Sequence, residues 1–278
     1  MTATSRAALV AVLLALPQTA RAAVINPERT NALVVFAVFC ASVLIFIRLA
    51  KGGRPLYIRR IAGLSAIDEA VGRATELGRK VMYIPGLASI DDNQTIASLA
   101  VLRHIARTTA RSSTDLEVPN RDPLTFATAR ETVREAYMEE GRPDLYAEEM
   151  VNYVTYDQFS YTASVSGRMV RDRPATTFLV GSFHAESLLL AETGQAAGAM
   201  QIAGTAEVAQ LPFLVVTCDY TLIGEELYAA GSYLSQDYVM LGSIKGQDFT
   251  KALIILALVA GAILTSFGFT ILQDFFHL

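Results

Sequence analysis

Residues 176–194 read TTFLVGSFHAESLLLAETG, and this stretch predicts the fold of the central part of the chain. The run from Thr176 to Val180 is β-branched and aromatic, as in a buried strand, and the segment from His184 to about Ala197 is typical of a helix. Gly181 marks the turn between them. A buried strand that passes directly into a helix is the repeating unit of a parallel sheet with crossover helices.

The same alternation extends on both sides of this stretch. Further strands are expected at 81–84, 115–118, 151–156, 200–203 and 213–217, with an edge strand at 238–241. Helices are expected at 65–77, from a cap within 91–95 to 107, and at 124–140, 158–170 and 222–234. The sequence therefore predicts an α/β domain over residues 56–247: a Rossmann-like, mostly parallel sheet with helices on both faces.

Composition places part of the chain in lipid. Of the 278 residues, 52% are hydrophobic, and the mean hydropathy is +0.36. Residues 32–49 and 252–272 are long apolar stretches, which as helices would extend about 27 Å and about 31 Å, so two transmembrane helices are expected to flank the domain. The net charge of −4 gives no basic footprint, so nucleic acid is not expected as a partner, whereas the lipid bilayer is.

The chain ends and the charged flanks predict a topology. Residues 1–22 combine Arg6, an apolar run and Ala-Arg-Ala, as in a cleaved secretory signal peptide, with an uncleaved anchor as the alternative. Residues 23–31 and the tail 273–278 are then extracytoplasmic, and 50–55 form a linker. Positive charge gathers on the inner side of both spans, at Arg48, Lys51, Arg54, Arg59, Arg60, Lys245 and Lys251. We therefore expect a protein of the prokaryotic inner membrane with its main domain in the cytoplasm.

Several familiar sites are missing from the sequence. Cys40 lies in the first span and Cys218 in the reducing compartment, so no disulfide is expected. No cysteine or histidine spacing signals a metal site, and none is predicted. Neither a G-x-G-x-x-G after a strand, nor a P-loop, nor a G-x-S-x-G elbow is present. A standard dinucleotide fold, a P-loop NTPase and an α/β-hydrolase are therefore disfavoured, and the cofactor is unknown.

Function is expected where the strands of the sheet end. In open parallel sheets, ligands bind outside the carboxyl ends of the strands, because loops and helix N-termini converge there. This rule selects a set of candidate ligand-binding residues: Asp91, Asn120, Asp122, Ser182, His184 and Thr221.

Two catalytic hypotheses come from the same edge. A neutral His184 beside Glu186 or Asp219 would act as a general base, although Ser182 and Glu186 are also what an ordinary helix start contains. Cys218 paired with His184 would act as a nucleophile, although a cysteine at the end of a buried strand is usually inert.

The second span carries small residues at every fourth position, Ala257, Gly261 and Thr265. Such a stripe lets another helix approach closely, so self-association or a membrane partner is expected along it.

Four stretches resemble an uncharacterised family of prokaryotic membrane proteins described as a domain of unknown function: QTIASLAVL, HAESLLLAETG, QIAGTAEVAQLPFLVVTCDYTLIGEELYAAGSYLS and LGSIKGQD. The resemblance extends over about residues 55–251. It implies a membrane-anchored cytoplasmic domain but brings no activity and no catalytic residue.

Three functions remain open at this point. The first is a non-catalytic module that binds a small ligand or assembles with copies of itself or a partner. The second is a membrane-tethered hydrolase or transferase that uses His184 with Asp219 or Glu186. The third is a structural subunit of a larger membrane complex.

Overall fold

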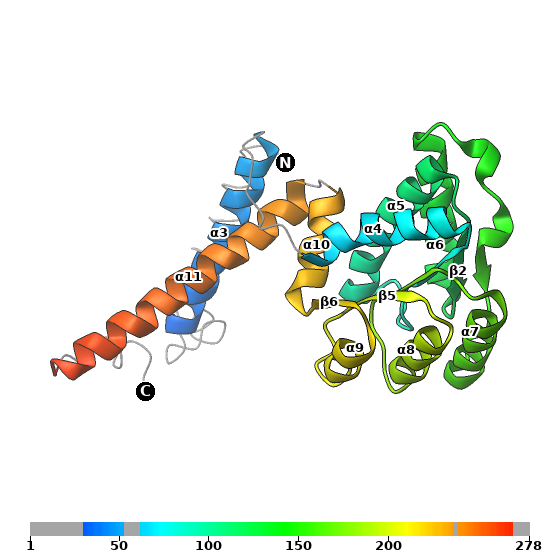
Figure 1. Ribbon diagram of the computed structural model, residues 1–278. Helices are drawn as coiled ribbons and strands as arrows, with labels where there is room; N and C mark the ends of the chain where they lie inside the picture. Colours follow the sequence, from blue (N-terminus) through cyan, green and yellow to red (C-terminus); the bar gives the residue numbers. More distant parts are fainter. Residues whose placement is uncertain (1–29, 53–61, 236–237, 269–278) are drawn as a thin grey trace. The chain divides into compact units, whose positions relative to one another are not determined.

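The computed structural model describes residues 30–52, 62–235 and 238–268, and the chain divides into two compact units. One unit contains the helices α3 (Thr30–Lys51) and α11 (Tyr238–Ser266), and the other, residues 57–237, is the α/β domain (Figure 1). The expected signal peptide 1–22, most of segment 23–31, linker residues 53–55 and the tail 273–278 lie outside the described residues.

The domain is built on one parallel sheet of six strands in the order β3-β2-β1-β4-β5-β6. This arrangement confirms the predicted α/β, Rossmann-like fold. The strand order reverses between β1 and β4, which makes this pair the topological switch point of the sheet. The strands are β1 (Val81–Ile84), β2 (Leu116–Asn120), β3 (Val151–Tyr153), β4 (Thr176–Val180), β5 (Met200–Thr205) and β6 (Tyr220–Ile223).

Helices cover both faces of the sheet (Figure 1). One layer consists of α4 (Ala62–Leu77), α5 (Asn93–Ser112), α6 (Pro123–Glu139) and α10 (Glu225–Ser235). The other layer consists of α7 (Gln158–Asp172), α8 (Glu186–Ala196) and α9 (Leu211–Thr217). Two short 3-10 turns, Pro143–Leu145 and Glu148–Met150, precede β3.

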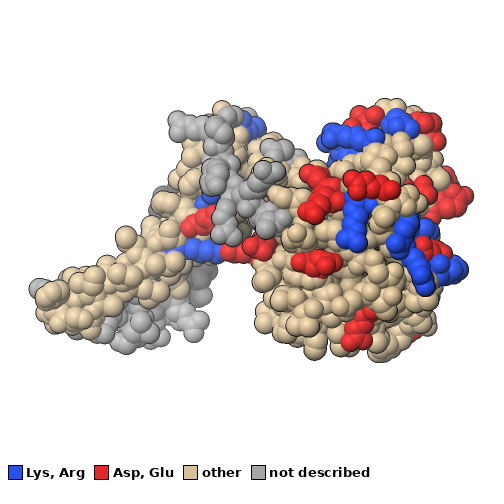
Figure 2. All heavy atoms as spheres, viewed as in Figure 1, with Lys and Arg blue, Asp and Glu red and all other residues tan. Residues whose placement is uncertain are grey.

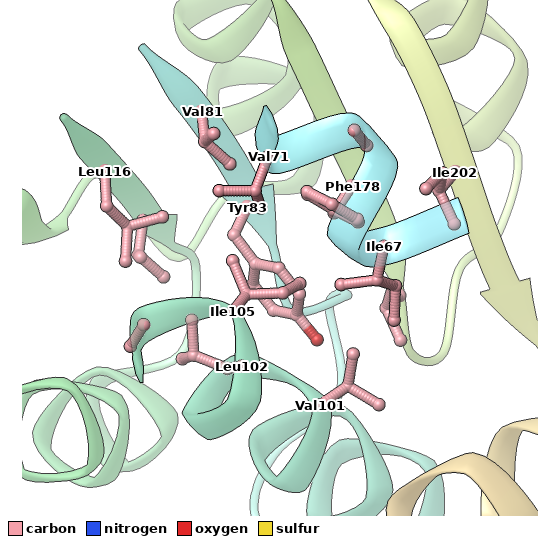
Figure 3. Close-up of a cluster of buried hydrophobic side chains, with 14 of the residues drawn as sticks. Ile67, Val71, Val81, Tyr83, Val101, Leu102, Ile105, Leu116, Phe178 and Ile202 are labelled. Atoms are coloured by element: carbon pink, nitrogen blue, oxygen red, sulfur yellow. The ribbon is translucent and has the colours of Figure 1, made fainter. Parts of the chain in front are cut away.

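Each strand contributes alternate side chains to two separate cores, as the pleat requires. Val81 and Tyr83 of β1 pack with α4 and α5, as Figure 3 shows, whereas Met82 and Ile84 pack toward α7 and α8. Phe178 of β4 lies beside Tyr83, with ring centroids 6.1 Å apart. Both faces of the central strands are therefore buried, which explains why their sequences are continuously apolar.

The structure corrects the predicted end of the domain. Residues 213–217, expected to be a strand, lie in helix α9, and the last strand is β6 at Tyr220–Ile223. An apolar run of five residues fits either state. Here Pro212 stands in the first turn of α9, and the backbone N–H of Leu214 donates to the Gln210 carbonyl at 3.2 Å.

Two further boundaries differ from the prediction. β3 ends at Tyr153 instead of residue 156, and residues 238–241 begin helix α11 instead of forming an edge strand. Four residues are too few to show the period of either a strand or a helix. In the structure, 238–241 form the first turn of the helix that follows.

Both α3 and α11 are long and apolar enough to cross a membrane, and they pack against each other. A Cβ on Gly242 would lie 2.5 Å from Ile47 Cα, and one on Gly246 would lie 2.6 Å from Val43 Cα. The Ser42 hydroxyl donates to the Gly246 carbonyl at 3.1 Å. This G-x-x-x-G pair therefore makes the close helix contact, at a different place from the predicted stripe of small residues.

The outer surfaces of α5 and α6 are joined by ion pairs. Glu140 accepts hydrogen bonds from Arg111 Nε at 2.6 Å and Nη2 at 2.7 Å, and from Arg107 Nε at 2.6 Å. These bonds, the one from Arg111 foremost, lower the pKa of Glu140 to about 2. Arg103 pairs with Glu135 and Glu139 beside them.

Replacement of Glu140 by glutamine should destabilise the protein at neutral pH. Arg111 is 60% exposed, so solvent screens the pair and the expected loss is roughly 1 kcal/mol. Because the folded-state pKa of Glu140 is lowered, its contribution is complete above the unfolded value of about 4.3 and fades as pH falls toward 2.

Urea unfolding of the full chain in detergent, repeated from pH 7 to pH 2.5, measures this difference. A gap between wild type and variant that stays constant across this range would contradict the assignment.

Candidate functional site

The carboxyl edge of the sheet brings together the loops 85–92, 121–122, 154–157, 181–185 and 206–210. These loops hold most of the side chains that the sequence placed in a site. Asp91, Asn120, Asp122, Ser182 and His184 all lie along this edge, because the strands before them are parallel.

At the switch point, the loops after β1 and β4 approach each other closely. The backbone N–H of Leu87 donates to the Ser182 carbonyl at 2.8 Å. A Cβ on Gly86 would lie 2.7 Å from that carbonyl oxygen, and both Gly86 (φ 85°) and Gly181 (φ 137°) adopt positive φ. The Leu87 and Phe183 side chains are fully buried below this contact. At the place where ligands usually bind in this topology, the two loops therefore hydrogen-bond to each other.

Carboxylates of the chain occupy the helix N-termini along this edge. Asp92 accepts from the Gln94 N–H at the start of α5, and Asp157 accepts from the Ser160 N–H at the start of α7. Asp122 accepts from the first two free N–H groups of α6 at 3.0 and 2.8 Å, and from the Ser89 hydroxyl at 3.2 Å. These backbone groups would otherwise bind an anion such as phosphate. The three aspartates accept hydrogen bonds from these N–H groups, and their negative charge would repel an anionic ligand.

Glu186 contacts the backbone of His184, whereas the hypothesis placed it beside the imidazole. Glu186 is fully buried and accepts from the backbone N–H of His184 at 2.7 Å and from the side chain of Gln158. The His184 side chain is exposed, in the loop before α8 and not in the first turn of the helix. Glu186 thus orders the turn, and its acceptor groups are committed to that task.

Arg121 is a structural residue of this edge that was not among the predicted site residues. It donates to the Leu87 carbonyl from Nη1 and to the Tyr156 carbonyl from Nε, both at 2.7 Å, and its guanidinium lies 4.6 Å from the Tyr156 ring centroid. One side chain therefore joins the loops after β1, β2 and β3. Its place in the loop Pro-Asn-Arg-Asp-Pro was the available signal, because a cation between two candidate polar residues, Asn120 and Asp122, needs a partner.

Gln94 makes a second unpredicted link. Its Oε1 accepts from the Ala206 N–H at 2.7 Å, and its Nε2 donates to Glu207 at 3.1 Å. The first turn of α5 is thereby fixed to the loop after β5.

The side chain of buried Asn120 has only part of its hydrogen bonds. Its Nδ2 donates to the Val118 carbonyl at 2.9 Å, whereas no described residue donates to its Oδ1.

Cys218, Asp219 and Thr221 lie away from this edge, which overturns the predicted pairing with His184. Because α9 precedes β6, Cys218 and Asp219 stand at the amino end of β6, and Asp219 accepts from the Gln201 N–H at the start of β5. His184 follows the opposite end of β4, so a strand length of about 13 Å separates them. Thr221 lies inside β6, where its hydroxyl donates to the Leu214 carbonyl at 3.4 Å.

A family of uncharacterised proteins shares this combination of parts. The family model described as a domain of unknown function (DUF6754) matches residues 20–276. The chain belongs to this family. The match includes α3, the whole α/β domain and α11, so the two apolar helices and the domain are parts of one family unit. No curated protein and no solved structure matches the chain.

A methyl group at the switch point should destabilise the fold. Gly181→Ala places a Cβ 2.9 Å from the Pro85 carbonyl carbon at a φ of 137°, so we expect a loss of about 3 kcal/mol. The matched control is Gly167→Ala in α7, where a Cβ meets nothing within 4 Å, and there a gain of about 0.5 kcal/mol is expected. Thermal unfolding of the two full-length variants measures both values, and equal effects would refute the close approach.

The thiol of Cys218 should react slowly in the folded protein, because burial raises its pKa to about 11. At pH 8 its thiolate fraction is then about one thousandth, against about a quarter for a free cysteine. Alkylation by iodoacetamide of a Cys40→Ala chain, native and in urea, compares the two states. We expect a native rate roughly 100-fold lower. Equal rates would contradict the raised pKa of Cys218, and a faster native rate would show that it is an activated thiol.

Proposed function

We propose that the protein is a non-catalytic assembly module of the inner membrane. Its cytoplasmic α/β domain holds copies of the chain together while α3 and α11 anchor it in the bilayer. The cytoplasmic orientation rests on the positive residues around the spans, which bias translocation. Arg48, Lys51, Lys245 and Lys251 all belong to the inner flanks in this topology.

The observation that carries the proposal is that groups of the chain itself engage the loops and helix N-termini at the carboxyl edge of the sheet. The contact between the loops after β1 and β4, the carboxylate caps of α5, α6 and α7, and the links from Arg121 and Gln94 use the groups that would otherwise hold a ligand. An edge built in this way favours a rigid scaffold over ligand binding or turnover. The hydrolase alternative has less support, because it needs His184 beside Asp219 or Glu186. Asp219 lies at the other edge of the sheet, and the Glu186 carboxylate accepts from the backbone N–H of His184.

The third alternative, a structural subunit of a larger membrane complex, differs only in the partner. It draws support from the family match, which treats both helices and the domain as one unit. Copies of the chain are the simpler partner, because every anchored copy is already confined to the same bilayer, where its effective concentration is high.

Energy transfer between copies in lipid vesicles tests the proposal. Full-length chains with Cys40→Ala and Cys218→Ala carry donor or acceptor dyes at the exposed position Glu76→Cys. We expect transfer to persist as lipid is added, because associated copies dilute together. Transfer that falls to zero on dilution, without a protein partner co-purifying in detergent, would overturn the proposal.

The variant His184→Ala is the matched control for turnover. We expect it to associate as the wild type does. Hydrolysis of an ester or phosphoester panel by the wild type, lost in this variant, would instead establish the enzyme hypothesis.

A further inference from the structure

Helices α3 and α11 pack antiparallel, and their contacts define one register. Gly242 lies against Ile47 and Gly246 lies against Val43, so closely that neither glycine leaves room for a Cβ. Each step of four residues along α11 thus matches a step of four residues back along α3. Counted in this way from the first pair, residue 240 lies opposite 49 and residue 257 lies opposite 32. The first predicted span, 32–49, therefore faces residues 240–257.

This observed register conflicts with the position of the second predicted span, 252–272, because only residues 252–257 of it lie opposite the first span. At the contact itself, Gly246 lies at the depth of Val43, which is about 9 Å inside the first span when counted from residue 49. The segment of α11 at this depth contains three charged residues: Lys245, Asp248 and Lys251. Charged side chains in the hydrocarbon of a bilayer are costly. Figure 2 shows the C-terminal part of α11 in tan, without charged residues.

The sequence of α11 repeats the residues that make the contact with α3. We define the first triplet as the three buried small residues of α11: Gly242, Gly246 and Thr250. The same pattern of a small residue, a glycine and a threonine recurs from 257 on, in a second triplet: Ala257, Gly261 and Thr265. The step from 242 to 257 is about 22 Å along a helix and returns to within about 60° of the same face. The two triplets therefore offer α3 similar surfaces at two depths.

A move of α3 to the second triplet aligns the two spans. With Ile47 opposite 257 and Val43 opposite 261, the first span lies opposite 255–272, where the sequence contains no charged residue. The charged segment 245–251 then lies outside the hydrocarbon, on the positive inner flank. Ala257 carries a methyl group where Gly242 has none, so the helices are slightly further apart at that point. Residues 52–61 join α3 to α4, and a chain of this length reaches about 33 Å, enough for the move.

We propose that α3 moves from the first triplet to the second when the two helices enter the bilayer. The inference rests on the membrane anchoring in the proposed function, and it gives the anchor two states. In the observed register α3 covers the first triplet, and in the bilayer it covers the second. Insertion thereby uncovers the Gly242 and Gly246 face on the cytoplasmic side, so this face is available only in an anchored chain.

Crosslinking between cysteines tests the move in full-length chains with Cys40→Ala and Cys218→Ala. The rings of Phe46 and Phe249 have centroids 5.8 Å apart, so Phe46→Cys with Phe249→Cys reports the observed register. Phe46→Cys with Leu264→Cys reports the shifted register, because 249 and 264 are separated by the same step as the triplets. A short bis-methanethiosulfonate reagent is added to chains in vesicles of phosphatidylethanolamine and phosphatidylglycerol. We expect about tenfold more 46–264 product than 46–249 product.

Two glycine variants form a matched pair for this assay. Gly261→Leu fills the second triplet and should lower the 46–264 product about tenfold. Gly246→Leu fills only the first triplet and should leave that product unchanged. A chain that combines Lys245→Leu, Asp248→Leu and Lys251→Leu should regain the 46–249 product in vesicles, because the observed register then places no charge in lipid.

The outcomes separate the inference from the proposed function. A 46–249 product that equals or exceeds the 46–264 product in vesicles overturns the inference alone. A 46–264 product with the mass of two chains also overturns it, because α3 then packs against α11 of another copy. Extraction of the vesicles with alkaline carbonate tests the anchoring itself, and a chain that is released into the supernatant overturns the proposed function.

Discussion

The fold depends on the close approach of the two loops at its switch point. Because the strand order reverses between β1 and β4, their loops diverge in most sheets of this topology and leave a crevice. Here the Leu87 N–H reaches the Ser182 carbonyl, and Gly86 and Gly181 bring two backbones into contact where no Cβ fits. The buried hydroxyl of Ser98 supports the same region from below, since it donates to the Val180 carbonyl and bonds with the Tyr83 hydroxyl. Strand ends, loops and α5 thus form one block.

This constraint changes what the carboxyl edge can do. In a ligand-binding sheet, the free N–H groups of the helices remain available at the crevice. In this protein the same groups bind Asp92, Asp122 and Asp157, and Glu186 holds the turn before α8. Each contact stabilises its own helix or turn and together they make the edge acidic. The contacts that stabilise this edge therefore use backbone groups that a ligand could otherwise bind.

Much of the fold could be predicted because buried parallel strands leave a strong signal. The run Thr176–Val180 and the strand at 81–84 are bounded by turns and match the structure. Residues 213–217 misled because five apolar residues fit a strand or a helix, and only the tertiary environment, with Leu214 alone buried, distinguishes them. That one error moved Cys218 and Asp219 to the wrong edge of the sheet. Local patterns placed Asn120 and Asp122 at the carboxyl edge, but the links from Arg121 and Gln94 join distant loops, which one sequence cannot show.

In the structure, the misleading stretch leaves most of its apolar side chains exposed. A strand at 213–217 would have buried its apolar side chains between two helical layers, whereas a surface helix exposes them. A soluble monomer gains nothing from Val216 at 83% exposure.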